Sequence, residues 1–240
     1  MNTQAPEKRV TSDGVTLAVN SLFYTIQGEG PYAGRPAIFI RLAGCNLQCP
    51  LCDTEYTKRD DYAVSELVQM VLSHIVGVPG AYTRAGRREA PIVVITGGEP
   101  FRQPIGYLVQ CLLDIGVYVQ IETNGTLHQP GPWTSSQVTI VCSPKAGQVH
   151  PLLVPLVGAW KYVARADRLA QDGLPTSALE HPNARGLYRP PSDHPAPIYL
   201  QPADEQDDAA NARNTAAVVQ ACLEYGYRLC LQVHKIVNVP

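Results

Sequence analysis

Short apolar runs rich in valine and isoleucine recur along the chain and alternate with segments of helical period. Runs that are apolar at nearly every position are typical of parallel strands buried on both faces. The pattern therefore predicts strands at 37–44, 92–98, 117–125, 138–145, 197–202 and 228–237.

Three segments between these strands have the apolar spacing of amphipathic helices, at 64–75, 104–116 and 205–225. Acidic residues, Glu205 among them, open the third segment at the positive end of a helix dipole, and Gly226 ends it. Alternating strands and helices indicate an α/β protein with a parallel sheet, either open or closed into a barrel.

Two stretches interrupt this alternation, at 77–91 and 165–197, and both are rich in glycine, proline and arginine. Doubling the length of a loop costs only about 0.6 kcal/mol, so both can be tolerated surface insertions. A lid or a partner surface is the alternative, and the second stretch has room for a short helix at 166–171. We expect one domain over residues 1–240.

Composition and charge narrow the function classes. The chain has 240 residues, 45% of them hydrophobic, and a formal net charge of −2. A net charge of this sign and size does not indicate binding to duplex nucleic acid or to an anionic membrane. A polar start and the lack of a long apolar run argue against a secretory signal or a membrane span. We expect a cytoplasmic location, where thiols stay reduced.

Three of the seven cysteines, Cys45, Cys49 and Cys52, form a C-x₃-C-x₂-C motif. Gly44 and Pro50 favour a loop here, because proline disfavours helical geometry for the residue before it. A loop that curls round one point can aim all three sulfurs inward. Thiolates are the ligands that zinc and iron–sulfur clusters prefer.

The number of cysteines discriminates between those two metals. A closed structural zinc site takes four ligands, and the nearest fourth candidate is Asp53. A four-iron cluster held by three thiolates leaves one iron open, which suits a site that binds and transforms something. The sequence favours a [4Fe–4S] cluster over zinc and over a packed group of thiols.

The motif, placed in a loop after a strand, resembles that of the radical S-adenosylmethionine superfamily. TGGEP (96–100), which directly follows the strand IVVI, fits the same scaffold. Members bind adenosylmethionine at the open iron and cleave it with one electron to a 5′-deoxyadenosyl radical. The resemblance implies an incomplete (β/α)₆-type barrel of parallel strands, although Leu51 stands where the superfamily often has an aromatic residue.

Within that superfamily the chain is similar to the 7-carboxy-7-deazaguanine synthase family. The matching blocks are FYTIQGEGPYAGRPAIFIRLAGCN (23–46), CDT (52–54), SPK (143–145), QPAD (201–204) and HKIVNVP (234–240). This resemblance implies radical ring contraction of 6-carboxy-5,6,7,8-tetrahydropterin to 7-carboxy-7-deazaguanine with loss of ammonia. The reaction belongs to 7-deazapurine (queuosine-type) biosynthesis.

The resemblance also implies a role for each matching residue. Cys45, Cys49 and Cys52 would hold the [4Fe–4S] cluster, and Thr54 would bind Mg²⁺. The adenosylmethionine site would be lined by Leu51, Asp53, Gly98, Ser143, Pro144, Lys145, Gln201, Pro202, Ala203 and Asp204. The pterin substrate would contact Ile26, Gln27, Gly28, Arg41, Thr96 and Pro240.

Two of these roles have independent physical support. The guanidinium of Arg41 suits a carboxylate. A final strand at 228–237 would bring the carboxylate of Pro240 to the carboxyl ends of the strands, where active sites of parallel sheets lie.

The expected partners are a small pterin substrate, an electron donor such as a flavodoxin or ferredoxin, and a second copy of the chain. Nucleic acid and membrane are not expected. Two alternatives remain: a radical enzyme that activates another protein, and a zinc-binding module without catalysis.

Overall fold

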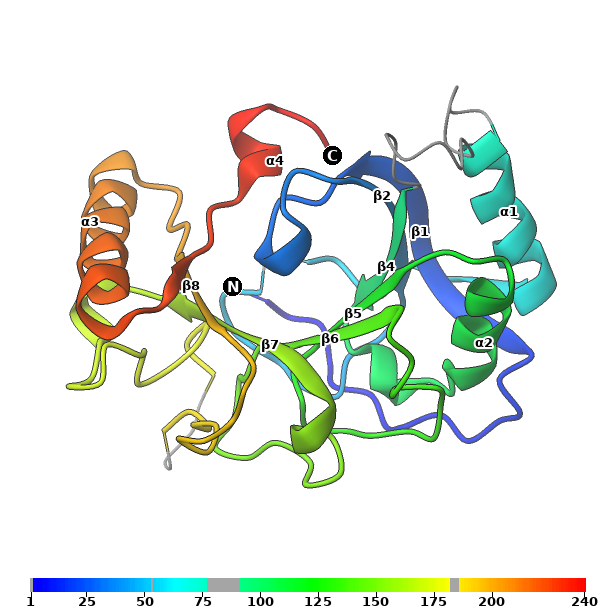
Figure 1. Ribbon diagram of the computed structural model, residues 1–240, viewed down its shortest axis with the longest axis horizontal. Coiled ribbons are helices and arrows are strands. Elements are labelled where there is room, and N and C mark those ends of the chain that lie inside the picture. The colour runs from blue at the N-terminus through cyan, green and yellow to red at the C-terminus, as the bar shows by residue number, and fades with distance from the viewer. Residues whose placement is uncertain (1, 53, 77–90, 182–185) are drawn as a thin grey trace.

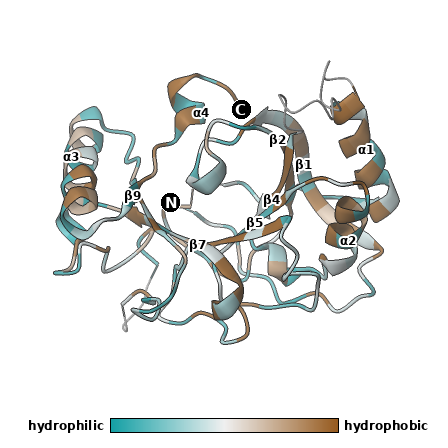
Figure 2. Ribbon diagram, viewed as in Figure 1, coloured by the Kyte–Doolittle hydropathy of each residue, from teal (hydrophilic) through white to brown (hydrophobic). Residues whose placement is uncertain are grey.

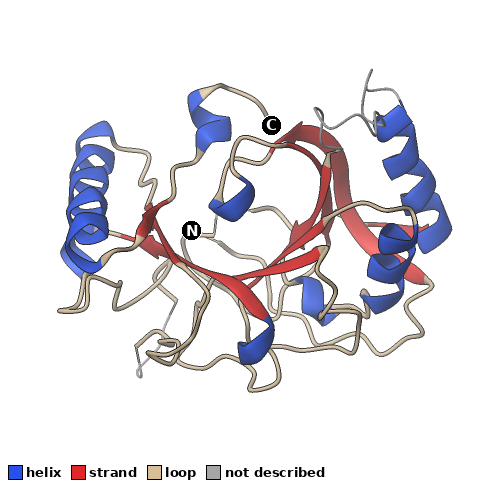
Figure 3. Ribbon diagram, viewed as in Figure 1, coloured by secondary structure: helices blue, strands red, loops and turns tan. Residues whose placement is uncertain are grey.

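The computed structural model describes residues 2–52, 54–76, 91–181 and 186–240. The predicted insertion at 77–91 therefore lies, apart from residue 91, outside the described residues. The described chain folds into one curved nine-stranded sheet with helices on its outer side (Figure 3). The order of the strands is β3-β1-β2-β4-β5-β6-β7-β8-β9.

From β2 to β9 the neighbouring strands run parallel, whereas β1 and β3 form an antiparallel edge. In the described part of the chain the end strands β3 and β9 do not pair, so the barrel is open. This confirms the predicted incomplete α/β barrel. The strands are β1 (Thr16–Ile26), β2 (Pro36–Leu42), β3 (Asp60–Ala63), β4 (Ile92–Gly97), β5 (Val119–Thr123), β6 (Val138–Cys142), β7 (Val157–Ala164), β8 (Ile198–Pro202) and β9 (Arg228–Leu229).

The core follows from the valine- and isoleucine-rich runs. In β4, all four residues from Ile92 to Ile95 are fully buried. Ile38 of β2 lies beside Val93, and Ile40 beside Ile95, so branched side chains pack in register across the parallel pair. Strands buried on both faces explain why the sequence shows runs here rather than alternation.

Three helices cover the outer side of the sheet. Helix α1 (Val64–Val76) lies beside β1, α2 (Gly106–Asp114) beside β5, and α3 (Asp208–Tyr225) beside β8, as Figure 1 shows. Their apolar residues, brown in Figure 2, include the buried stripe Val64, Leu67, Val71 and Ile75 of α1. All three predicted helices are confirmed. None of the helices in the described ranges is long and apolar enough to cross a membrane.

The ends of α3 differ in part from the prediction. Gly226 ends the helix in the left-handed conformation, with φ +75°, as its position predicted. The helix begins later than predicted, because the side chain of Asp207 accepts a 2.7 Å hydrogen bond from the amide of Ala210 and caps it there. Glu205 therefore lies before the helix and not in its first turn.

The predicted strand at 228–237 is wrong beyond Leu229. Only Arg228 and Leu229 pair with β8, through Tyr199 and Leu200. The chain leaves the sheet and forms the short helix α4 (Val233–Ile236), which lies between the β8 side and the β1–β2 side of the curved sheet (Figure 1). The expected helix at 166–171 is a 3-10 turn over Ala166–Arg168. Strands β1, β3 and β7 were not predicted.

Candidate active site

The carboxyl ends of the parallel strands converge on one cavity of about 360 Å³. The cysteine loop, which carries Cys45, Cys49 and Cys52, follows β2. The glycine-rich loop, which starts at Gly98, follows β4. Parallel strands end at the same edge of a sheet, so residues far apart in sequence meet there.

Most of the predicted site residues line this cavity. On its wall lie Ile26, Gln27, Arg41, Cys45, Cys49, Leu51, Cys52, Thr54, Thr96, Gly98, Ser143, Lys145, Gln201, Ala203, Asp204 and Pro240. Of the described residues, Gly28, Pro144 and Pro202 adjoin the wall in sequence without lining it. Asp53 lies outside the described residues.

The cysteine loop holds its thiols against the cavity. Cys45 and Cys49 are 8% and 7% exposed, and Cys52 is half-buried. Burial raises the pKa of Cys45 to about 12 and that of Cys49 to about 11. Thiols must lose their protons to ligate a metal, so a bound cation would have to offset the effect of burial at these two residues.

Glycine in the β4 loop allows a close approach to the first cysteine. A Cβ atom added at Gly98 would lie 2.2 Å from the carbonyl oxygen of Gly44 and 2.8 Å from the Cβ of Cys45. The next residue, Glu99, donates its amide to the same carbonyl of Gly44 at 3.0 Å. The glycine-rich loop therefore fixes the root of the cysteine loop, and only glycine fits at position 98.

The donor set fits an iron–sulfur group. Three thiols line one shared cavity beside a glycine backbone, and cysteine thiolates are the ligands of such clusters. Among the described residues no three His, Cys, Asp or Glu side chains come together around a single metal ion. Thr54, the predicted magnesium ligand, lies on the cavity wall.

Glu99 joins the β4 loop to the end of β5. Its carboxylate accepts hydrogen bonds from the Thr123 hydroxyl at 2.7 Å and from the amides of Asn124 and Phe101 at 2.8 and 2.9 Å. Burial raises the pKa of Glu99 to about 7 despite these bonds. The residue is a positioning group that connects the two strand ends.

A buried ion pair, which the sequence analysis missed, forms the floor of the cavity. The ammonium of Lys161 in β7 pairs with Glu29 and lies 3.9 Å from Glu122 Oε2. Burial opposes ionisation, but the charge of Lys161 and the hydrogen bonds from Lys161 and Gln232 together outweigh it and lower the pKa of Glu29 to about 2. The same carboxylates raise the pKa of Lys161, so both partners are charged.

Amide side chains extend this pair into a network. Gln232 donates to Glu29 at 2.9 Å, and Gln27 donates to Glu122 at 2.9 Å. The QGEG block contains Glu29 and was a signal available in the sequence. Lys161 gave none, because β7 itself was not predicted.

Arg41 and two aromatic rings form the wall on the β2 side. The guanidinium of Arg41 lies over the ring of Phe23, 5.5 Å from its centroid. In the described chain the buried Nε of Arg41 has no hydrogen-bond partner, so its N–H can donate to an anionic ligand. Phe23 and Phe39 stack at 5.3 Å and give a flat apolar surface beside it.

The C-terminal residues line the cavity and contact the end of β1 and the loop that follows it. The hydroxyl of Thr25 donates to the terminal Pro240 oxygen at 2.7 Å, and the amide of Val233 donates to the carbonyl of Gly28 at 3.1 Å. Pro240 therefore reaches the site by way of α4 and not from the end of a strand.

Part of the second insertion also lines the cavity. Ser177, Leu179 and Glu180 lie on its wall, and the carbonyl of Leu179 accepts a 3.1 Å bond from the amide of Leu51 in the cysteine loop. This part of the 165–197 stretch belongs to the site and is more than a tolerated surface loop.

An open parallel sheet whose first parallel strand leads into a C-x₃-C-x₂-C loop, opposite a glycine-rich loop, defines the radical S-adenosylmethionine class of enzyme. The curated protein "7-carboxy-7-deazaguanine synthase" of Rhodospirillum rubrum is 41% identical over 234 residues, covering 95% of this chain and 94% of its own length. The protein of that name from Rickettsia prowazekii is 38% identical, covering 98% and 94%. The chain belongs to the 7-carboxy-7-deazaguanine synthase family.

A solved structure agrees with this assignment. The crystal structure of QueE from Escherichia coli superposes with a TM-score of 0.65 at 25% identity, over 90% of this chain and 94% of that one. A scan against protein-family models gives no match.

Proposed function

We propose that the protein contracts the ring of 6-carboxy-5,6,7,8-tetrahydropterin to give 7-carboxy-7-deazaguanine and ammonia. One observation carries the proposal: a single cavity joins the three cysteines to the half-buried guanidinium of Arg41 and the flat surface of Phe23. The cysteines suit an iron–sulfur cluster, and the other two residues suit a planar molecule that carries a carboxylate.

The cofactor sites follow the order of the strands. Cys45, Cys49 and Cys52 would hold a [4Fe–4S] cluster. Adenosylmethionine would lie beside the cluster, along the loops after β4, β6 and β8. Asp53 would also line the adenosylmethionine site. Bound together, the two cofactors supply one-electron cleavage and abstraction of a hydrogen atom from the substrate. Thr54 is proposed for Mg²⁺ beside the substrate carboxylate.

The residues of the chain would position the substrate and exclude water. Arg41 would hold the pterin carboxylate with its fixed charge, as Phe23 keeps the guanidinium in place. The carboxylate of Glu122, held by Gln27 and Lys161, would accept hydrogen bonds from N–H groups at the other end of the pterin. Pro240 and α4 would close the cavity, which keeps a reactive radical away from solvent.

An anaerobic assay tests the proposal. Protein with a reconstituted cluster, adenosylmethionine, a reductant and the tetrahydropterin should form a deazapurine and one ammonia for each substrate consumed. Arg41→Lys should raise KM for the carboxylated substrate, because a point charge replaces the fork of two N–H groups. Consumption of adenosylmethionine without any deazapurine would point instead to an enzyme that activates another protein.

The homodimer, the cytoplasmic location and the flavodoxin or ferredoxin donor remain predictions. The donor can be tested by replacing the chemical reductant with either protein and measuring turnover.

A further inference from the structure

We propose that residues 2–10, here called the N-terminal strap, are part of the metal site. The strap positions the cysteine loop (residues 44–52 and 54–56) in the shape that receives the cluster. This inference rests on the proposed function, because it takes the cysteine loop as the cluster site.

The strap contacts the loop beside all three cysteines. The amide of Asn2 donates to the carbonyl of Pro50 at 2.8 Å, and its side chain donates to the carbonyl of Cys49 at 3.2 Å. The amide of Glu7 donates to the carbonyl of Cys45 at 2.7 Å. Two of the three proposed ligands therefore have their backbone held directly by the strap.

Gln4 holds the loop just after the third cysteine. Its side-chain oxygen accepts from the amide of Tyr56 at 2.7 Å, and its side-chain nitrogen donates to the carbonyl of Thr54 at 2.9 Å. One side-chain amide thus satisfies two backbone groups, as a neighbouring strand would do. Tyr56 is 1% exposed, so water does not readily replace this bond.

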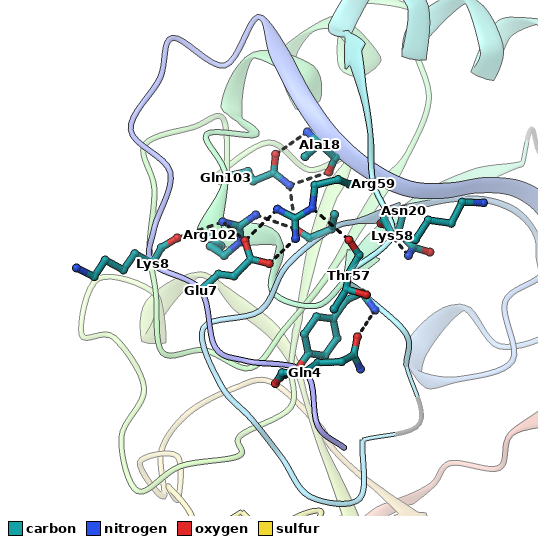
Figure 4. Close-up of polar contacts among 12 residues, drawn as sticks. Gln4, Glu7, Lys8, Ala18, Asn20, Thr57, Lys58, Arg59, Arg102 and Gln103 are labelled. Carbon is teal, nitrogen blue, oxygen red and sulfur yellow. Dashed lines mark hydrogen bonds and ion pairs between the residues drawn. The ribbon is translucent and has the colours of Figure 1, made fainter. Parts of the chain in front are cut away.

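A buried arginine anchors the strap at its other end. Figure 4 shows Glu7 between the guanidinium groups of Arg59 and Arg102, with Gln4 further along the strap. The side chain of Arg102 is 4% exposed and lies 3.2 Å from Glu7 Oε2. It also donates to the backbone carbonyls of Lys8 at 3.1 Å and Ala43 at 3.0 Å.

This anchor couples the strap to the root of the loop. The guanidinium of Arg102 packs on Gly44, where an added Cβ would lie 2.5 Å from its nearest nitrogen. The hydrogen bond from Arg59 is the main reason that the pKa of Glu7 is lowered, so Glu7 stays charged. Detaching the strap would leave a buried cation without its carboxylate, which is unfavourable.

The exposure of the strap residues agrees with this role. Asn2, Gln4 and Glu7 are half-buried toward the loop, whereas Thr3 and Lys8 are exposed. An irregular loop loses conformational entropy when it wraps round a ligand, and a strap that orders it beforehand removes part of that cost.

The experiment compares Gln4→Ala with Thr3→Ala, a neighbouring exposed residue on the same strap. In metal-free, reduced protein, the alkylation rate of each cysteine is measured by peptide mass spectrometry, with the fully buried Cys142 as internal reference. In Gln4→Ala we expect Cys45 and Cys49 to react on the order of tenfold faster relative to Cys142, because two partly buried hydrogen bonds to the cysteine loop are lost. Thr3→Ala should match the wild type.

A second measurement follows iron release to a chelator from the anaerobically reconstituted proteins. Gln4→Ala and Glu7→Gln should lose iron on the order of tenfold faster than Thr3→Ala and the wild type. Unchanged alkylation and iron release in both variants would overturn the role of the strap. Equal acceleration at Cys142 would also overturn it, because it would indicate a general loss of stability.

The outcomes separate this inference from the proposed function. If wild-type protein takes up no cluster, the proposed function fails. If the wild type holds its cluster and the strap variants hold it equally well, only the role of the strap is refuted.

Discussion

The buried pair of Lys161 and Glu29 allows a quantitative prediction. The Lys161 side chain is 9% exposed, and its positive charge lies within 4 Å of both Glu29 and Glu122. Lys161→Met keeps most of the aliphatic volume and removes that charge. Two carboxylates are then left together in a largely buried space, and at least one must become neutral.

The size of the effect follows from the proton that Glu29 must bind. Protonating at pH 7 an acid whose ordinary pKa is 4.5 costs about 3.4 kcal/mol, because each unit of difference between pH and pKa is worth about 1.36 kcal/mol. This lies within the roughly 3–5 kcal/mol expected when one partner of a buried pair is removed. At pH 5.5 the same neutralisation costs only about 1.4 kcal/mol.

The pH dependence has a definite sign. In the wild type the folded pKa of Glu29 is about 2, so its contribution is complete above pH 4.5 and is lost only as pH falls toward 2. In Lys161→Met, Glu29 is buried without the cation, so its pKa in the folded state rises above its value in the unfolded state. Protonation then favours the folded state, and the variant should recover stability relative to wild type as pH falls from 7 to 5.5.

The assay is denaturant unfolding of the metal-free protein at both pH values. The control is Arg168→Met, which removes an exposed ion pair with Asp167 and should cost less than about 1 kcal/mol at either pH. If Lys161→Met lowers the free energy of unfolding by less than about 1 kcal/mol at pH 7, or by the same amount at both pH values, the predicted role of the Lys161 charge is wrong.

Three further predictions concern the proposed site. Changing any cysteine of the C-x₃-C-x₂-C motif to alanine should abolish iron binding and turnover, whereas Cys111→Ala should retain both. Iron analysis and a turnover assay test this, and a motif variant with full turnover would contradict the assignment. Gly98→Ala should prevent cluster binding because of the 2.2 Å approach to the carbonyl of Gly44, and normal iron content in that variant would show that the two loops can separate. A C-terminal tag after Pro240 should depress activity, because the terminal oxygen bonded to Thr25 would become a peptide carbonyl; an unchanged rate would remove Pro240 from the site.

Much of the fold could be predicted from local patterns. The run from Ile92 to Ile95 and the apolar stripe of α1 are buried as their periods indicate. Strand β7 was not predicted, because Gly158 and Lys161 interrupt its apolar run, and the lysine is buried only through its pairing with distant carboxylates. At 228–237 the sequence has the pattern of a strand, but β8 offers partners for only two residues.

The site was predictable where a motif follows a strand. The cysteine loop follows β2 and the TGGEP block spans the end of β4, and a parallel sheet necessarily brings these strand ends together. The pair of Glu29 and Lys161 was not predictable, because its members are 132 residues apart and lie in different elements. The N-terminal strap has no apolar period at all, since its contacts use backbone groups and amide side chains.

The central claim is that three cysteines hold an iron–sulfur cluster with one iron open to adenosylmethionine. Electron paramagnetic resonance of the anaerobic, reduced protein tests it directly. The account predicts a cluster signal that shifts when adenosylmethionine is added and that is lost in the cysteine variants. A signal that adenosylmethionine leaves unchanged, or a protein that holds zinc and no iron, would contradict it.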